Sequence, residues 1–152
     1  MWYLIKSVVE FPKGIFEIDS NMINAVNKGM NEITDDLLRV AQQRSPVDEG
    51  TLEQSGTSQV ISSKRMIKGL VSFSARNRGY NYALKMDKGK YNLGKKSLSK
   101  SSRGVRSKFS KVSMKVGSGY LSDSAEKCKD GYTKHINEEL GKAIMKSGFK
   151  LK

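Results

Sequence analysis

A long helical pattern near the N-terminus constrains the fold more than any other feature of the chain. Its apolar residues recur three or four positions apart and so form one stripe along a helix of about six turns. These residues are Met22, Ile23, Val26, Met30, Ile33, Leu37, Val40 and Ala41. Asp19 or Ser20 can cap the start. Pro46 disfavours helical geometry at the residue before it, so the helix has to end by Ser45.

Stretches rich in β-branched and aromatic residues predict the strands against which this helix packs. The candidates are residues 2–18 (two short pieces around a Pro-Lys-Gly turn), 57–63, 66–75 and 79–87. The stretches 57–63 and 66–75 are typical of a hairpin, in which Val71, Phe73 and Ala75 point to one face. The connector between them leaves the register open. The stretch 79–87 is a candidate third strand.

A second amphipathic helix is predicted near the C-terminus. Its apolar positions are spaced three or four apart: Leu121, Ala125, Cys128, Tyr132, Ile136, Leu140 and Ile144. Asp123 or Ser124 suits the first turn. Gly131 and Gly141 each cost about 1 kcal/mol relative to Ala, so this helix depends on packing. The order of elements predicts one α+β domain over residues 1–152, with two long amphipathic helices packed on a small antiparallel sheet.

The net charge of +13 is carried by one half of the chain. Residues 1–76 hold nine basic and nine acidic side chains, whereas residues 77–152 hold nineteen and six. Between Lys85 and Lys115 there are eleven basic residues and one acid, Asp87. This asymmetry favours an anionic partner. We expect a long, flexible basic loop at 88–115.

Seven side chains of this loop are predicted to face an anion or DNA: Lys95, Lys96, Lys100, Arg103, Arg106, Lys108 and Lys111. Only Tyr91 and Phe109 lie among them, so base stacking by the loop is poorly supported. The alternative is a solvated loop that becomes ordered against an acidic protein. Proximity to DNA and contact with protein are equally favoured.

The residues that most often carry catalysis or bind metals are sparse. His135 has no partner at metal-ligand spacing, and contact with Glu138 or Glu139 on a helix surface is the favoured role. Cys128 lies on the apolar stripe, which indicates a buried side chain rather than a nucleophile. Glu32, Asp35 and Asp36 are predicted to lie on a solvated helix face. We therefore assign no catalytic, cofactor-binding or metal-binding residues.

The cysteine count, the first residues and the length of the apolar runs predict the compartment of the protein. A single cysteine excludes an intrachain disulfide and favours a reducing, intracellular environment. The first residues do not have the pattern of a signal peptide, and no apolar run approaches the ~20 residues of a membrane helix. We expect a soluble protein with no membrane partner.

The stretch RSPVDEGTLEQSG at residues 44–56 is predicted to be a structural corner. Pro46 ends the helix, Asp48 can form an Asx turn, and Gly50 permits a tight reversal. Leu52 then returns the chain to the core. The corner consists of Pro46, Val47, Asp48, Gly50 and Leu52.

This corner resembles one in the small tail-completion and head–tail joining proteins of tailed bacteriophages, which are often classed as minor capsid proteins. Members of that family have a long helix, a Pro-Val-Asp-x-Gly-x-Leu corner, and then a serine and a strand. A Tyr-Ala segment with an acidic-Gly step and a Gly-x-x-Phe/Leu segment before the last helix follow. The matching residues outside the corner are Ser55, Tyr82, Ala83, Asp87, Gly89, Tyr120, Leu121 and Ala125.

The similarity spans residues 20–146 in the same order, with two departures. The acid-Gly step lacks the usual threonine, and the insert at 90–111 is more basic than is typical of the family. The resemblance implies a non-enzymatic virion protein of the phage neck or tail end, present in the host cytoplasm during assembly. It also implies a homo-oligomeric ring, neighbouring neck and tail proteins as partners, and DNA passing through the channel.

Two alternatives come from other functional classes. The first is a free, non-enzymatic nucleic-acid-binding protein that uses the basic segment 85–115. The second is an enzyme, for which only His135 and the scattered acids are available.

Overall fold

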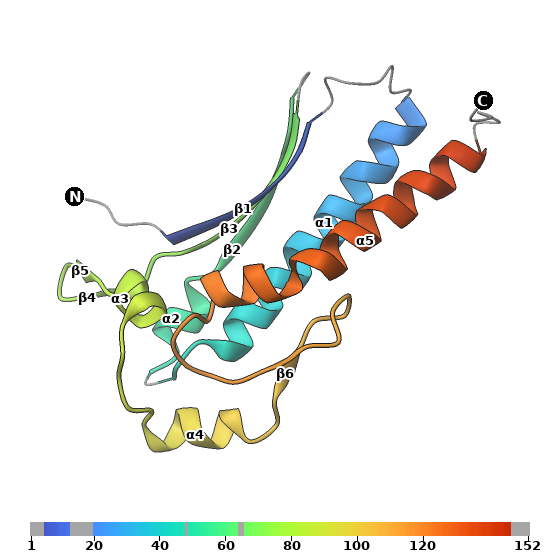
Figure 1. Cartoon of the computed structure of the whole chain (residues 1–152). Coiled ribbons are helices and arrows are strands. Elements are labelled where there is room, and N and C mark those ends of the chain that lie inside the picture. Colours follow the sequence, from blue (N-terminus) through green and yellow to red (C-terminus); the bar gives the residue numbers. More distant parts are fainter. Residues whose placement is uncertain (1–4, 13–19, 48, 64–65, 147–152) are drawn as a thin grey trace.

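The computed structural model describes residues 5–12, 20–47, 49–63 and 66–146 (Figure 1). In chain order its elements are β1 (Ile5–Pro12), α1 (Ser20–Arg44), α2 (Thr51–Gln54), β2 (Thr57–Ser62), β3 (Met66–Phe73), β4 (Arg76–Asn77), β5 (Tyr80–Asn81), α3 (Ala83–Lys88), α4 (Lys95–Ser101), β6 (Val105–Arg106), β7 (Ser113–Met114) and α5 (Ser122–Lys146). The predicted α+β class and both long helices are confirmed.

The main sheet has the strand order β1-β3-β2, and both pairings are antiparallel. Leu70 in the central strand lies opposite Val8 on one side and Gln59 on the other, which fixes the register that the sequence left open. The predicted hairpin of β2 and β3 is confirmed, and so is the first extended piece near the N-terminus. The second piece, at residues 15–18, lies outside the described residues.

The predicted third strand at 79–87 is wrong. Only Tyr80 and Asn81 are extended, and they pair with β4 in a separate two-stranded sheet. The Asn81 side chain then accepts a hydrogen bond from the Ala83 amide at 3.1 Å, which favours a helix start. Ala83 and Asp87 lie four residues apart and are both buried. Their common face therefore belongs to helix α3 and not to a strand.

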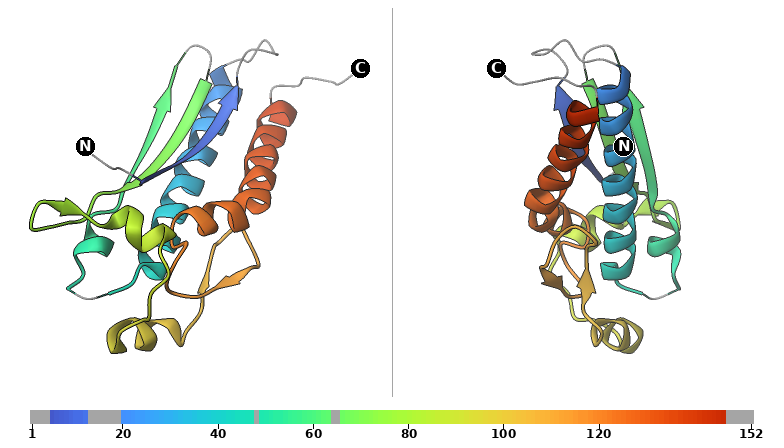
Figure 2. Two further views of the ribbon diagram at one scale, coloured as in Figure 1. Left: turned by 60° about the vertical axis from the view of Figure 1, so that its left-hand side comes forward. Right: turned by 90° about the vertical axis from the view of Figure 1, so that its right-hand side faces the viewer.

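Helix α1 packs on the sheet, against β2 and β3 (Figures 1 and 2). Side chains alternate along β3, and Ile67, Val71 and Phe73 are buried on the same face as Gly69. A Cβ atom on Gly69 would lie only 2.3 Å from the hydroxyl of Thr34 in α1. A glycine at this position is therefore what allows the helix to approach the strand so closely.

Helix α5 packs along α1 (Figure 2). Cys128, Tyr132 and Ile136 are buried, as the apolar stripe predicts. Just before α5, the ring of Tyr120 contacts the ring of Phe73 edge-on, with centroids 5.1 Å apart. α1 thus supplies the main helix contact with the sheet, and α5 joins the same core through α1 and Tyr120.

The 88–115 segment contains more regular structure than the predicted loop. Helix α4 and the paired strands β6 and β7 fall within it. Ser97, Val105, Ser107 and Met114 are buried among residues from other parts of the chain. A few apolar and small polar residues are sufficient to order this segment, because their side chains are buried against the rest of the protein.

Candidate functional site

Helix α4 lies near the end of α1, and the chain that follows it runs back along α1 to α5 (Figure 1). Six of the seven predicted anion-facing side chains are exposed on these segments: Lys95, Lys96, Arg103, Arg106, Lys108 and Lys111. We refer to these six as the basic surface. Their charges are accessible to an anionic partner from solvent.

Lys100, the seventh predicted residue, has an internal role instead. Its Nζ donates to the carbonyls of Gln42 at 2.7 Å and Ser45 at 3.1 Å, and pairs with Glu53 at 2.8 Å. Carbonyls in the last turn of a helix have no partner within the helix, so a cation there is stabilising. Lys100 therefore holds α4 to the end of α1 and does not belong to the anion-facing set.

The predicted corner lies between α1 and α2, and Asp48 within it is outside the described residues. Pro46 and Leu52 are buried. The Val47 amide donates to the hydroxyl of Ser97 at 2.8 Å, and that hydroxyl donates to the Val47 carbonyl at 3.2 Å. The corner is thus attached to α4 as well as to the core.

Gly50 has a φ of +85°, a left-handed conformation that glycine adopts most easily. Replacing it with Ala should cost about 1 kcal/mol of unfolding free energy, since Cβ clashes there with the backbone. The matched control is Gly94→Ala, because Gly94 has an extended conformation and open space around it. Urea denaturation checks this; equal stability of the two variants would contradict the strained-turn interpretation.

Asp36 is buried, which contradicts its predicted place on a solvated helix face. Its carboxylate accepts hydrogen bonds from the Ser107 hydroxyl, the Lys108 amide at 3.2 Å and the Tyr132 hydroxyl at 3.0 Å. Arg39 pairs with it at 2.7 Å. Burial, and the charge of Asp36 beside it, raise the pKa of Tyr132 above its usual range. One carboxylate therefore joins α1, α5 and the chain after β6.

The neighbouring acids behave differently. Asp35 is exposed, as predicted, and accepts a hydrogen bond from the Ser58 hydroxyl at 2.9 Å. Glu32 is half-buried and pairs with His135 of α5 at 2.5 Å. The His135 ring also stacks on Phe109, with centroids 4.2 Å apart. The predicted contact of His135 with Glu138 or Glu139 is thus replaced by a contact between helices.

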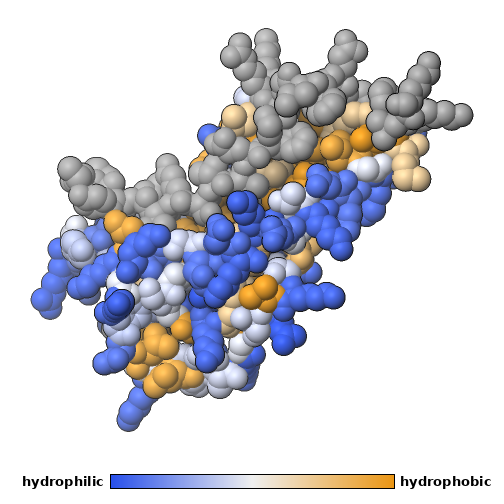
Figure 3. All heavy atoms as spheres, in the orientation of Figure 1, coloured by the Kyte–Doolittle hydropathy of each residue, from blue (hydrophilic) through white to orange (hydrophobic). Residues whose placement is uncertain are grey.

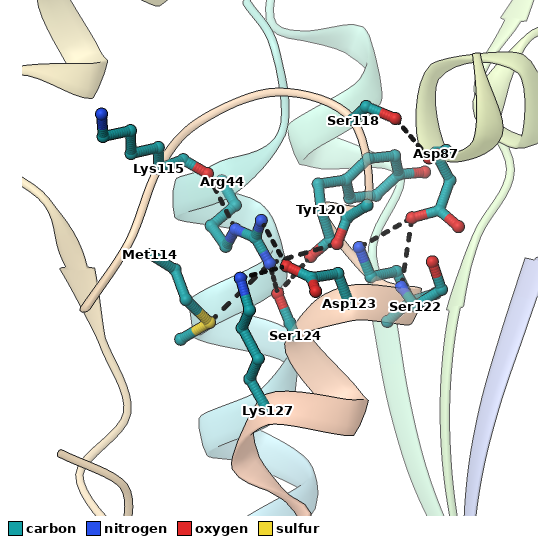
Figure 4. Close-up of polar contacts among 12 residues, drawn as sticks. Arg44, Asp87, Met114, Lys115, Ser118, Tyr120, Ser122, Asp123, Ser124 and Lys127 are labelled. Atoms are coloured by element: carbon teal, nitrogen blue, oxygen red, sulfur yellow. Dashed lines mark hydrogen bonds and ion pairs between the residues drawn. The ribbon is translucent and has the colours of Figure 1, made fainter. Parts of the chain in front are cut away.

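Arg44, the last residue of α1, is the centre of a second buried network (Figure 4). Its guanidinium donates to the carbonyls of Lys115 at 2.8 Å and Gly119 at 3.1 Å, and to the Ser124 hydroxyl at 2.8 Å. It also pairs with Asp123 at 2.9 Å. Burial alone would raise the pKa of Asp123, but hydrogen bonds from Lys127 and Arg44 outweigh it and lower that pKa.

Asp87 holds the other side of the same segment (Figure 4). Its carboxylate accepts the amides of Leu121 at 2.9 Å and Ser122 at 3.1 Å, which are the unpaired donors at the start of α5. Its carbonyl accepts the Gly119 amide at 2.7 Å and the Ser118 hydroxyl at 3.0 Å. Asp87 thus caps a helix that begins 35 residues later in the chain.

The three sequence segments of the phage resemblance therefore meet in space. Arg44 lies two residues before Pro46 of the corner, Asp87 is the acid of the Tyr-Ala segment, and both bind the stretch 117–124. The Tyr120 hydroxyl adds a hydrogen bond to the Ala83 carbonyl at 3.2 Å. We call this arrangement the junction. Its dominant role is to fix backbone segments to one another.

The remaining side chains that could act as a nucleophile or bind a metal are either buried or not grouped together. Cys128 is buried, as predicted, and burial raises the pKa of its thiol. Within the described part of the chain, no three His, Cys, Asp or Glu side chains are arranged so that they could hold a metal ion. No helix in the same part combines the length and apolarity needed to cross a membrane.

Three residues of these networks were not predicted from the sequence. Asp36 was expected on a solvated helix face, Asp87 appeared only as part of the phage resemblance, and Arg44 was given no role.

Comparisons of the chain with models of known protein families, with curated protein sequences and with solved structures found no match.

Proposed function

We propose that the chain is a structural virion protein of a tailed bacteriophage, forming part of a ring that joins head and tail or completes the tail. The observation that carries this proposal is the junction. The three segments that resemble the phage family are far apart in sequence, yet Arg44 and Asp87 bind them into one unit. Such a convergence is what a shared scaffold requires.

The residues of the junction also favour an architectural role. The Arg44 guanidinium is engaged with two carbonyls, a hydroxyl and a carboxylate. Asp87 uses its carboxylate and its carbonyl on the backbone before α5. Groups used in this way position chain segments and resist deformation, as a ring under mechanical load needs.

The main sheet offers a means of assembly. Within the described residues, β1 and β2 each pair with β3 only, so each has one open edge. Open strand edges can pair with a neighbouring subunit, and repeated contacts of this kind close into rings. We propose that a ring forms through such contacts and that the basic surface lies toward DNA or toward an acidic neighbour.

Particle composition tests the proposal. An antibody raised against the chain should detect it in particles or tails purified from the source, at a constant ratio to the other structural proteins. Electron microscopy of the purified chain, alone and with particle proteins, should show rings. A chain that never accompanies particles and forms no assembly would contradict the proposal.

The basic surface favours a second candidate, a non-enzymatic nucleic-acid-binding protein that uses segment 85–115. We expect DNA binding that is weak, independent of sequence and steeply reduced by salt. Replacing the six residues of the basic surface with Ser should abolish binding of a DNA duplex, because the phosphate contacts that supply it are lost; each such contact accounts for about 0.9 of the slope of log affinity against log salt. Fluorescence anisotropy over a salt series measures both quantities.

Lys100 must be kept in that variant because it supports the end of α1. The control variant replaces Lys142 and Lys146, which are exposed in the last two turns of α5. It should keep most of the binding. Salt-resistant, sequence-specific binding by the monomer would favour the free DNA-binding protein over the virion protein.

A further inference from the structure

The β4–β5 hairpin projects from the body of the protein (Figure 2). Arg76 pairs with Asn81 and Asn77 with Tyr80, and a two-residue turn connects them. Every side chain from residue 76 to residue 80 is exposed. The hairpin therefore contributes little to the core, and its side chains are directed at solvent or at a partner.

The turn places a cation at the tip of the hairpin in an unfavourable backbone conformation. Arg78 has a φ of +48° and Gly79 a φ of +82°, as in the tight turn that usually carries Asn-Gly. Arginine is disfavoured in the left-handed region. Within the described part of the chain, no hydrogen bond or ion pair holds the Arg78 guanidinium in this turn, so it is available to a ligand.

An aromatic ring accompanies this cation. The Tyr80 side chain is 60% exposed, an unusual loss of apolar burial for a ring of this size. A hollow of about 760 Å³ lies between the hairpin, α3 and the corner. Tyr80, Tyr82, Arg78 and Lys85 line it, and Glu49 is its single acid. In Figure 3 the side of the molecule that carries this hairpin is mostly hydrophilic.

We infer that the hairpin and this hollow bind single-stranded nucleic acid, with a base stacked on Tyr80 and phosphates held by Arg78 and Lys85. Cations that follow a phosphate backbone beside an aromatic ring are the two elements of such sites. An intact duplex keeps its bases stacked on one another, so it cannot use the ring. An acidic peptide would use the cations and leave the ring without a role. The inference rests on residues outside the basic surface and does not depend on the proposed function.

The test is fluorescence anisotropy with a labelled oligothymidylate of about ten nucleotides. Tyr80→Ser should weaken binding at least about five-fold, the lower end of what one stacked base contributes, whereas Tyr80→Phe should bind like the wild type. Arg78→Gly should also weaken binding. Because glycine suits the turn better than arginine, that loss cannot be attributed to unfolding of the hairpin.

The matched control is Lys134→Gln, which removes a positive charge from an exposed position on α5 and should leave binding unchanged. Glutamine is used because a glycine at this position would weaken the helix. The variant with Ser at the six positions of the basic surface should bind less at low salt and keep its dependence on Tyr80. In this six-Ser variant, equal affinity for a duplex of the same length, or no effect of adding Tyr80→Ser, would overturn the inference. Binding of an oligoglutamate peptide as tight as that of the oligothymidylate would replace it with an acidic protein partner.

Discussion

Replacing Asp36 with Ala is expected to destabilise the protein by about 3–5 kcal/mol, as breaking a buried, hydrogen-bonded charge does. The carboxylate is the common acceptor for Ser107, Lys108 and Tyr132. Alanine leaves these donors without a partner, and each buried unpaired group costs about 1–3 kcal/mol. Arg39 contributes less to the loss because it is partly exposed and also binds Gln43.

Asp35→Ala is the matched control for this prediction. Asp35 is the adjacent residue on the same helix, but it is exposed and makes its hydrogen bond at the surface. Its replacement should cost less than about 1 kcal/mol. Urea denaturation gives the difference, and amide exchange should show residues 105–110 opening in the Asp36 variant alone. Equal stability of the two variants would show that Asp36 does not organise this segment.

The sequence predicted the long elements because their patterns are local. Each helix has an apolar stripe with a helical period, and β2 and β3 lie on either side of a short connector. The end of α1 followed from the restriction that Pro46 places on the residue before it. The 79–87 segment was misread because its apolar residues fit a strand, whereas an Asn81 hydrogen bond and the burial of Ala83 with Asp87 determine a helix.

The buried charges were harder to predict because their partners are distant in the sequence. Asp36 pairs with residues more than 70 positions away, and Asp87 caps a helix 35 positions later. One signal was available for Asp36, which is three residues from Ile33 and four from Val40 and so borders the apolar stripe. No local pattern separates Lys100, which binds the end of α1, from the exposed lysines around it.

Replacing Arg44 with Met is expected to cost about 3–5 kcal/mol and to release the segment 115–124. Methionine fills a similar space but has no donor for the carbonyls of Lys115 and Gly119 or for Ser124. Arg44→Lys should recover little of this stability, because one ammonium cannot reproduce the planar set of donors that serves these acceptors. Arg106→Met, at an exposed position, is the control and should change stability by less than about 0.5 kcal/mol.

Asp123 gives this prediction a pH dependence. Its pKa is lowered in the folded protein by Lys127 and Arg44, against the opposing effect of burial. A carboxyl with a lowered pKa stabilises the fold above its ordinary value of 3.8, and this stabilisation is lost as the pH falls through the folded value. Removing Arg44 should therefore reduce the loss of stability on acidification, and so should Asp123→Asn. In a double-mutant cycle the two substitutions should be less than additive. Additive costs would mean that Arg44 acts through the two carbonyls and the Ser124 hydroxyl, in which case the junction would be held by these hydrogen bonds and not by the ion pair.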